Sequence, residues 1–452
     1  MNEMISDKQN FFLSIHSSTK KIKCITLALG LSIFITGSSY ATESHTPSGS
    51  TSKINESPTS VRDLVSCTSG KKGKRFGFLD VYGQSRDSLY NIWKDKFGMD
   101  LIAESSRMAN DLGIGWIRLS FWYPKNKLDS YSRKKYDQAV ADGLDIFATI
   151  YIDEKDHLNE NAYVWLETIV SEYSSKIKYW QVHNEVGKPN RYAQADTYIE
   201  LLARSSSTIK KACPDCSVVM GSTLPNKNYY TLVIDKGDSY VDAYDFHIFF
   251  AEDMPSFKDF SSRVHKPIFI TEMATHSGQP QGSRRMSAPY HSEREQAQTL
   301  IKWYTQAFSS GAGYIFWSQF VEWFGFMGQI DGLFDFTGIV YNGMCDSPAT
   351  DNVCRDSNID KGAGVKKEAY YSLKALISKI GNFSAVEQIA EWRYKFTVDG
   401  KSVYVVWCDS SSGRLLSELR GPIKVTDYLG KEATVQADSL RLSESPVFIE
   451  TD

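Results

Sequence analysis

From residue 76 onward, two patterns of apolar and polar positions alternate along the chain. Short, nearly continuous apolar runs, such as 115–124 and 267–275, are typical of buried strands. Longer segments with apolar residues three or four apart, such as 100–113 and 292–311, predict amphipathic helices that follow these runs. The pattern repeats eight times, which indicates a parallel sheet covered by helices on both faces.

Eight strand-helix units are the number that closes a parallel sheet into a barrel. A doubly wound open sheet is the alternative, but no Gly-x-Gly-x-x-Gly turn follows the first strand. The chain continues past the eighth unit, and residues 390–452 alternate in short strands, with the turn VDGK at 398–401 marking a hairpin. We therefore expect an α/β fold, with a (β/α)8 TIM barrel over residues 73–384 followed by a small C-terminal all-β, sandwich-like domain over 385–452.

The N-terminal residues have the pattern of a targeting segment. Three lysines at 20–23 precede an apolar run over 24–36, which leads to the small-x-Ala ending Ser39-Tyr40-Ala41. These features predict a secretory signal peptide over residues 1–41, with a buried N-terminal helix as the alternative. Residues 42–72 are rich in Ser, Thr and Pro and predict a disordered linker. We expect a secreted or periplasmic protein with no integral membrane segment after signal cleavage.

The cysteines agree with export. An even number follows the predicted signal, which favours disulfides in an oxidising compartment. Cys213 and Cys216 enclose Pro-Asp; redox chemistry or half a zinc site is possible, but no second such pair occurs, and a small structural bridge is the preferred interpretation. Two other cysteines share one polar loop and are expected to pair, and the remaining two pair by elimination. These two pairs are Cys345 with Cys354 and Cys67 with Cys408.

Composition excludes one class of partner and suggests another. The formal net charge is −3 and the isoelectric point is near 6.3, and no Lys/Arg stripe is present, so nucleic-acid binding is not expected. Aromatic residues make up 13% of the chain, and their flat apolar faces are suited to packing against sugar rings.

Two expected strands each end on a glutamate. The fourth delivers Asn184 and Glu185, and the seventh delivers Glu272. The C-terminal ends of barrel strands meet in one mouth, so these two carboxylates can face each other across it. A facing pair can divide the acid and nucleophile roles around a glycosidic bond, if one is protonated and the other ionised. The alternative is a pair of ordinary surface carboxylates.

This arrangement resembles the retaining glycoside hydrolases of clan A, whose barrels carry an Asn-Glu acid/base at strand four and a glutamate nucleophile at strand seven. Arg118 in strand two, His247 in strand six and Trp317 in strand eight also match the pattern. The resemblance covers about residues 76–380 and is nearest to family thirty-nine and to family-five-like members. The C-terminal domain resembles the small sandwich that follows the barrel in many members.

The resemblance implies a role for each matched residue. Glu272 would attack the anomeric carbon, and Glu185 would protonate the departing oxygen. Asn184 would hold the 2-hydroxyl, and Arg118 would keep Glu272 ionised. The remaining two would line the substrate site, with Trp317 as the floor for the non-reducing sugar and His247 beside the nucleophile. No cofactor or metal is implied, and the expected partner is a carbohydrate.

One position departs from the clan pattern. Many members have a tyrosine or a second histidine just after the strand-six histidine, whereas Ile248 and two phenylalanines follow here. Tyr151 and Tyr244 are the candidates to supply a hydroxyl near the nucleophile. Arg118 could instead make a structural ion pair, and His247 and Trp317 could be core residues. The loop after strand eight offers aromatic residues for a cleft wall, namely Trp323, Phe324 and Phe326.

Two functional hypotheses remain. The first is a secreted β-glycoside hydrolase, with transglycosylation as a variant that uses the same residues. The second is a catalytically inactive carbohydrate-binding or host-interaction protein built on the same barrel. Presence of Asn184, Glu185 and Glu272 together favours the enzyme.

Overall fold

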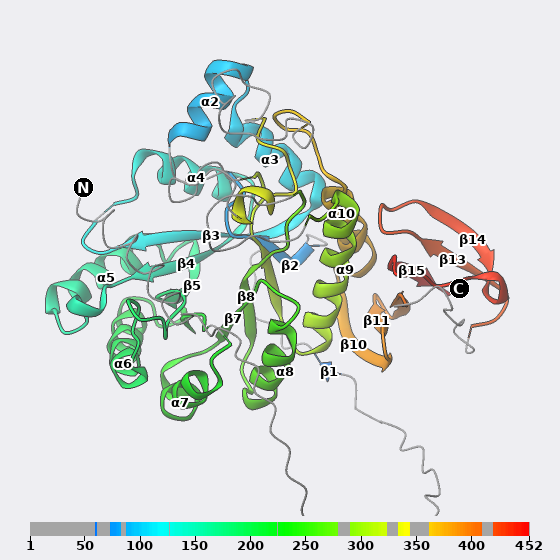
Figure 1. Ribbon diagram of the computed structural model, residues 1–452. Coiled ribbons are helices and arrows are strands. Elements are labelled where there is room, and N and C mark those ends of the chain that lie inside the picture. The colour runs from blue at the N-terminus through cyan, green and yellow to red at the C-terminus, as the bar shows by residue number, and fades with distance from the viewer. Residues whose placement is uncertain are drawn as a thin grey trace, which may run out of the picture. The chain divides into compact units, whose positions relative to one another are not determined.

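A computed structural model of the chain is shown in Figure 1. It describes residues 59–60, 73–82, 87–125, 127–223, 225–278, 290–322, 333–343, 361–408 and 419–451. Residues 58–452 form one compact unit, and everything below concerns that unit. The predicted signal peptide and most of the predicted linker lie outside the described residues. Within those ranges no helix combines the length and the hydropathy that crossing a membrane requires.

Parallel strands form the barrel, in the sheet order β6-β5-β4-β3-β2-β9-β8-β7. Two further bridges, Val219 with Ala243 and Thr223 with Phe246, join the outermost strands β6 and β7 and close the sheet. The predicted eight-stranded barrel is therefore confirmed. Its strands are β2 (Gly73–Phe78), β3 (Ile114–Trp122), β4 (Asp145–Tyr151), β5 (Ile177–Val182), β6 (Ser217–Met220), β7 (Tyr244–Ile248), β8 (Ile268–Met273) and β9 (Tyr314–Trp317).

The helices lie outside these strands (Figure 1). Helix α3 shows how the sequence fixes the ends: the Asp100 side chain accepts from the first-turn amides of Ile102 and Ala103, and Gly113 ends the helix at φ 73°. One helix, α2, was not predicted. The helices are α2 (Asp87–Phe97), α3 (Leu101–Leu112), α4 (Ser130–Ala141), α5 (Glu160–Tyr173), α6 (Ala195–Ala212), α7 (Lys227–Gly237), α8 (Asp253–Arg263), α9 (Glu293–Ser309) and α10 (Glu368–Ile380), with short 3-10 turns η1 (Glu154–Asp156), η2 (Asp238–Tyr240), η4 (Leu333–Phe336) and η6 (Ala437–Ser439).

An apolar plug fills the barrel interior near the start of the strands. Alternate residues of a strand point to the same face, so one side chain from most strands reaches this level. All the members are buried and most are aromatic, and several pack edge to face, for example Trp116 against Tyr179 at a centroid distance of 5.2 Å. The plug excludes water below the barrel mouth. Its members are Trp116, Phe147, Tyr179, Val219, Ala243, Phe269, Tyr314 and Phe316.

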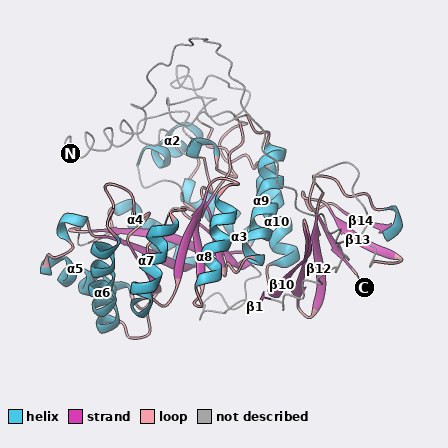
Figure 2. Cartoon of the chain, turned by 60° about the horizontal axis from the view of Figure 1, so that its bottom comes forward, coloured by secondary structure: helices cyan, strands magenta, loops and turns pink. Residues whose placement is uncertain are grey.

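The C-terminal domain is one antiparallel sheet with the strand order β1-β10-β11-β12-β15-β13-β14, and Figure 2 shows its strands grouped apart from those of the barrel. Asp399 and Gly400 have positive φ angles of 49° and 80° and form the predicted hairpin turn. Thr59–Ser60 pair with β10, so these two residues of the predicted disordered linker are in fact a strand. The strands are β1 (Thr59–Ser60), β10 (Phe383–Ala390), β11 (Arg393–Val398), β12 (Lys401–Val406), β13 (Pro422–Thr426), β14 (Glu432–Gln436) and β15 (Val447–Glu450).

This all-β domain, predicted as sandwich-like, packs one sheet face against barrel helices and covers the other with a small core of its own. Phe383 packs on Phe308 of α9 at a centroid distance of 4.9 Å. The Tyr428 hydroxyl donates to Glu368 of α10 and accepts from Arg294 of α9, at 2.9 and 3.1 Å. The sheet is thus anchored to the last two barrel helices. The core on the other face contains Val406, Leu419, Ile423, Val425, Ala437, Leu442 and Ile449.

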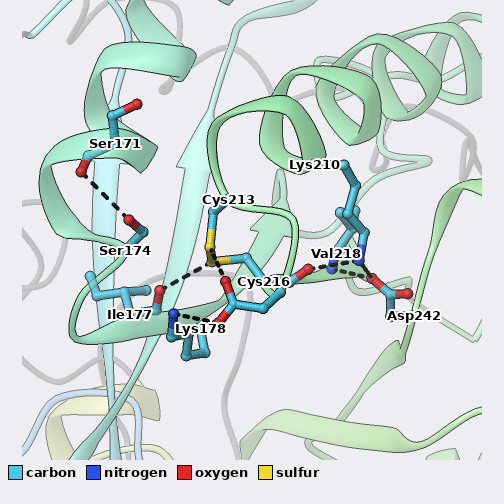
Figure 3. Close-up of a disulfide and its surroundings, with 10 residues drawn as sticks. Ser171, Ser174, Ile177, Lys178, Lys210, Cys213, Cys216, Val218 and Asp242 are labelled. Atoms are coloured by element: carbon cyan, nitrogen blue, oxygen red, sulfur yellow. Dashed lines mark hydrogen bonds and ion pairs between the residues drawn. A yellow bond between two sulfur atoms is a disulfide. The ribbon is translucent and has the colours of Figure 1, made fainter.

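A disulfide joins Cys213 to Cys216 in the turn between α6 and β6 (Figure 3). Lys210 donates to the Cys216 carbonyl at 2.7 Å, and Lys178 pairs with Asp215 at 2.8 Å. The predicted structural bridge is confirmed, and neither sulfur remains as the thiolate that a zinc site needs. The turn precedes β6, so it lies at the opposite end of the strands from the predicted mouth.

The other predicted pairings are not tested. Cys67, Cys345 and Cys354 lie outside the described residues, so both of the remaining bridges stay predictions.

Candidate active site

A polar layer lies directly above the apolar plug. Each of its members follows a plug residue by two positions, so the alternation of the strand points both into the barrel. Its side chains are buried, and such groups must find hydrogen-bond partners inside the protein. The layer consists of Arg118, Thr149, Gln181, Asp245 and Thr271.

Arg118 organises one half of this layer. Its Nε donates to Thr149 Oγ1 at 2.7 Å, and Nη2 donates to Gln181 Oε1 at 2.7 Å and Asn184 Oδ1 at 2.6 Å. Its Nη1 donates to Glu272 Oε1 at 2.7 Å. A planar guanidinium fixes the angles between these partners, so Arg118 positions the ends of β5 and β8 relative to each other.

Asp245 organises the other half. Its Oδ2 accepts from Gln181 Nε2 and from Thr271 Oγ1, each at 2.5 Å, and its Oδ1 accepts from the Thr271 amide at 2.8 Å. Burial raises the pKa of Asp245, although the charges of His247 and Arg118 act against the rise. Gln181 thus connects the two halves into one network across the barrel.

A β-bulge turns Glu272 toward the mouth. Between the pairs Asp245–Phe269 and His247–Glu272, strand β7 advances by two residues and β8 by three. The extra residue re-aims the side chain that follows Thr271, as bulges beside active sites commonly do. Glu272 therefore faces inward next to Thr271, which strict alternation would not allow.

The two predicted carboxylates meet in the mouth. A carboxylate oxygen of Glu185, a carboxylate oxygen of Glu272 and a ring nitrogen of His247 all lie within 4.8 Å of one another. With Asn184 and Arg118, five of the six residues expected from the sequence come together here. The same three groups could coordinate a metal ion. The positive charges of Arg118 and of two basic side chains described below would repel such an ion.

His247 lies between the two glutamates. Its Nδ1 is 3.5 Å from Glu185 Oε1, and its Nε2 is 3.7 Å from Glu272 Oε1 and 3.1 Å from Thr271 Oγ1. Burial would lower the His247 pKa, but the surrounding carboxylates of Glu272, Glu185 and Asp245 outweigh it, and the pKa is raised. The residue is buried, yet its contacts are those of the site rather than of the hydrophobic core.

The backbone that carries Glu185 leaves the strand in an uncommon conformation. His183 and Glu185 have φ angles of 68° and 50°, a region that residues other than glycine rarely occupy. The Ser222 hydroxyl accepts from the Glu185 amide at 2.9 Å and donates to Asn184 Oδ1 at 3.1 Å. Strained residues of this kind cluster at functional sites, where surrounding contacts hold them.

Two cations that the sequence analysis missed bind the same carboxylate oxygen. Lys188 Nζ and Arg191 Nη1 lie 2.5 and 2.9 Å from Glu185 Oε2. Burial would raise the pKa of Glu185, but the interactions with His247, Lys188 and Arg191 outweigh it, and the pKa is lowered. Without a ligand, Glu185 is therefore held ionised, which differs from the protonated acid that the resemblance implies. The spacing of the three residues along the loop, 185, 188 and 191, was the available signal.

Tyr151 is the hydroxyl candidate that lies at the site. Burial raises its pKa, and the charges of Arg118, Glu272 and Arg191 all act on it. The other candidate, Tyr244, donates to Asp238 at 2.6 Å and belongs to the core outside the barrel. Trp122, which sequence analysis missed, stacks on Tyr151 at 3.7 Å with an interplanar angle of 4°, and it is 42% exposed. The exposed Trp122 ring at the mouth is thus separated from the buried network by the Tyr151 ring.

The prediction for Trp317 is wrong. Its side chain is 0% exposed, donates to the Thr337 carbonyl at 3.0 Å and lies parallel to the Tyr304 ring of α9. Its neighbour Phe316 points into the barrel, so strand alternation turns Trp317 outward toward the helix. It cannot floor a sugar subsite. The predicted cleft-wall aromatics Trp323, Phe324 and Phe326 lie outside the described residues.

Comparison with known proteins supports the fold through structure rather than sequence. No protein-family model and no curated protein matches the sequence significantly. A family 39 glycoside hydrolase from Bacteroides cellulosilyticus WH2 has a similar structure, with a TM-score of 0.61 at 15% identity over 87% of this chain and 83% of that one.

Two further enzymes share the fold. A family 39 β-xylosidase from Caulobacter crescentus superposes with a TM-score of 0.53 at 12% identity, over 84% of this chain and 96% of that one. An α-L-arabinofuranosidase from Thermotoga maritima gives 0.52 at 11% identity, over 87% and 98% of the two chains. At these identities the likeness concerns the fold. At that level, the expected likeness to clan A glycoside hydrolases, family 39 among them, is confirmed as a likeness of fold.

Proposed function

We propose that the protein is a retaining glycoside hydrolase that cleaves β-glycosidic bonds in an oligosaccharide or polysaccharide. One observation carries the proposal: oxygens of Glu185 and Glu272 lie within 4.8 Å of each other across the barrel mouth. Retaining pairs are separated by about 5–5.5 Å, whereas inverting pairs need about 6.5–9.5 Å to admit a water molecule between carboxylate and sugar. The short separation favours direct attack by one carboxylate.

The reaction proceeds by double displacement. Glu272 attacks the anomeric carbon while Glu185, protonated, gives its proton to the departing glycosidic oxygen. The glycosyl-enzyme ester is then hydrolysed by a water molecule whose proton returns to Glu185. One water is consumed, and the configuration at the anomeric carbon is retained.

Neighbouring groups prepare both carboxylates. Arg118 donates to Glu272 Oε1 at 2.7 Å and holds the nucleophile in position. The side-chain oxygen Oδ1 of Asn184 accepts hydrogen bonds from Arg118 and from Ser222. These bonds fix the side-chain amide so that its Nδ2 can donate to the sugar 2-hydroxyl. Bonds to this hydroxyl strengthen in the transition state. His247 lies between the two glutamates, with one ring nitrogen near each carboxylate.

The protein is also proposed to be exported, on the strength of the signal-like pattern over residues 1–41. The Cys213–Cys216 disulfide is consistent with an oxidising compartment. Mass spectrometry of the protein recovered from outside the cytoplasm is expected to show cleavage after Ala41.

A second candidate function rests on a specific observation. Because Lys188 and Arg191 bind Glu185, the group that should act as an acid is ionised in the free protein. This arrangement favours an inactive carbohydrate-binding protein if no substrate releases the carboxylate.

Hydrolysis by matched variants separates the two candidates. Wild-type protein, Glu272→Gln and the control Glu167→Gln, on the outer helix α5, would be assayed on a panel of β-linked aryl glycosides and oligosaccharides. The hydrolase is expected to release product in wild type and the control, and Glu272→Gln is expected to be slower by at least about 1,000-fold. Glycan binding with no release by wild type would favour the inactive protein.

A further inference from the structure

The oxygens of Glu185 have opposite surroundings. Oε1 lies 3.5 Å from His247 Nδ1 in the interior, whereas Oε2 receives Lys188 and Arg191. The side chain of Glu185 is 14% exposed, and those of the two cations are 25% and 34% exposed. The ion pair therefore lies between the buried network and solvent, where a ligand can reach the cations.

The proposed reaction conflicts with this ion pair. Protonation of Glu185 removes the negative charge that Lys188 and Arg191 bind. Two partly buried cations would then lack a partner, and an unpaired charge in such a place is costly. A negative group from the substrate, set beside the cations, would replace the carboxylate and allow it to take up a proton.

The position of the cations identifies the part of the substrate concerned. Glu185 protonates the departing oxygen, so groups on its outer side lie next to the leaving-group sugar. Burial raises the pKa of Tyr151, and the nearby positive charge of Arg191 acts against the rise. The exposed Trp122 ring is stacked on Tyr151. An aromatic face and two cations thus adjoin the same side of the mouth, and sugar rings pack well on such faces.

We infer that the leaving-group subsite takes an anionic sugar, bearing a carboxylate or a sulfate, whose negative group binds Lys188 and Arg191 and so releases Glu185 to act as the acid. This inference rests on the proposed function, because it assigns Glu185 the acid role. Trp122 supplies the face on which that sugar packs. The substrate class is therefore an acidic oligosaccharide or polysaccharide.

Matched pairs of glycans test this inference by calorimetry on the full chain carrying Glu272→Gln, which prevents turnover. Each pair differs only in its carboxylate groups: cello-oligosaccharides with C6 carboxylates or C6 hydroxyls, xylo-oligosaccharides with a uronic acid branch before and after carboxyl reduction, and hyaluronan fragments before and after carboxyl reduction. Sulfated oligosaccharides and their desulfated forms complete the set and distinguish the two anionic groups. At least one anionic member is expected to bind about tenfold more tightly than its neutral partner, with an advantage that falls as salt rises.

The chain offers a matched control for the cations. Lys227 and Arg263 both bind the Asp259 carboxylate on the outer helices α7 and α8, at 3.0 Å each. Lys188→Met/Arg191→Met is expected to reduce the anionic advantage to about twofold or less, whereas Lys227→Met/Arg263→Met, with the same loss of charge, keeps it.

Replacing the competing carboxylate acts in the opposite direction. Glu185→Gln frees Lys188 and Arg191 and is expected to tighten binding of the anionic member, an effect that a purely structural ion pair would not produce. Melting temperatures confirm that each variant is folded. The salt series on protein that keeps Lys188 and Arg191 tests the inference without substituting either cation.

The outcomes separate the inference from the function. Binding of neutral members only, of no member, or of anionic members with no dependence on Lys188 and Arg191 would overturn the inference even if the protein hydrolyses glycans. Anionic binding with the expected dependence would support it. An absence of hydrolysis by wild type would then remove the proposed function and the acid role of Glu185, while the anionic subsite would stand.

Discussion

Two levels of the barrel interior, only two residues apart along the same strands, have opposite chemistry. The lower level is the apolar plug, represented by Trp116, Phe147 and Phe269. The upper level is the polar layer, in which Arg118 and Thr271 stand two positions after members of the plug. Neither level differs from the other in secondary structure or in burial.

The difference shows how the fold separates stability from chemistry. The plug removes apolar surface from water and seals the barrel below the mouth. The seal lowers the local dielectric, which strengthens the interactions of Arg118, Asp245 and Glu272 above it. Because the polar layer is buried, its groups must satisfy one another, and the Gln181 contacts to both halves accomplish this.

Arg118→Met attacks the polar layer and has the largest expected effect. It leaves Glu272 and the Asn184 amide without their shared donor, and an unpaired buried charge costs about 3–5 kcal/mol in the free energy of unfolding. Hydrolysis by the folded variant should fall by about 100-fold, since the catalytic groups lose their positioning. Urea unfolding and glycoside hydrolysis measure the two effects. Arg133→Met, which breaks an exposed pair with Asp137, is the control, and equal behaviour of both variants would contradict the account.

His183→Asn tests the acid sensitivity of the rim above the polar layer. Burial lowers the pKa of His183 to about 4, so above pH 6.5 the ring is neutral in both the folded and the unfolded chain. As the pH falls from 6.5 to 4, His183 binds a proton in the unfolded chain but not in the folded chain, so the free energy of unfolding decreases. Asparagine tolerates the positive φ and keeps an acceptor for the Asn184 amide.

The variant should therefore lose less stability on acidification than wild type, by about 3 kcal/mol between pH 7 and pH 4. Urea unfolding at both pH values measures this difference. Parallel loss in the two proteins would show that His183 is not the group concerned.

Phe269→Leu tests the plug. The ring contacts Phe147 and Tyr314 at centroid distances of 4.9 and 4.8 Å, and its truncation should cost about 1–2 kcal/mol in the free energy of unfolding. Turnover per folded molecule should change little, because the residue has no contact with the reacting groups. Activity lost without a loss of stability would break the distinction between the two levels.

The pH dependence of hydrolysis offers the smallest and most specific effect. Glu185 is faced by Lys188 and Arg191 from its own loop, by His247 from β7, and by Glu272 from β8. His247 and the two cations lower its pKa, and the acid works only when protonated, so activity on a neutral glycoside falls as the pH rises through that pKa. Lys188→Met/Arg191→Met should move this alkaline limb of kcat/KM to higher pH. A limb that stays in place would argue that the cations do not control Glu185.

Most of the architecture could be predicted from the sequence, because each strand-helix unit has a recognisable periodicity of apolar positions. Glu185 and Glu272 were also accessible, since strand ends of a barrel converge on one mouth. Asn184, Arg118 and His247 were found through the resemblance to clan A. Thr149, Gln181 and Thr271 could have been found as polar positions two residues after buried aromatics. Trp317 was misplaced because a one-residue shift in register reverses the face of a strand.

Other features were beyond pattern reading. The inward turn of Glu272 depends on a bulge that only the pairing of β7 with β8 reveals. The spacing of Glu185, Lys188 and Arg191 was visible in the sequence, but the positive φ angles of the backbone at His183 and Glu185 were not. Local departures from regular geometry of this kind shape the site but leave no sign in the pattern of apolar and polar residues.

The central claim is that Glu185 and Glu272 act on one bond from within 4.8 Å of each other. Proton NMR of the reaction on the best substrate, recorded before the product mutarotates, tests it directly. With retention, the β-anomer of the released sugar is expected to appear first. Initial release of the α-anomer would show inversion and would contradict direct attack by a carboxylate.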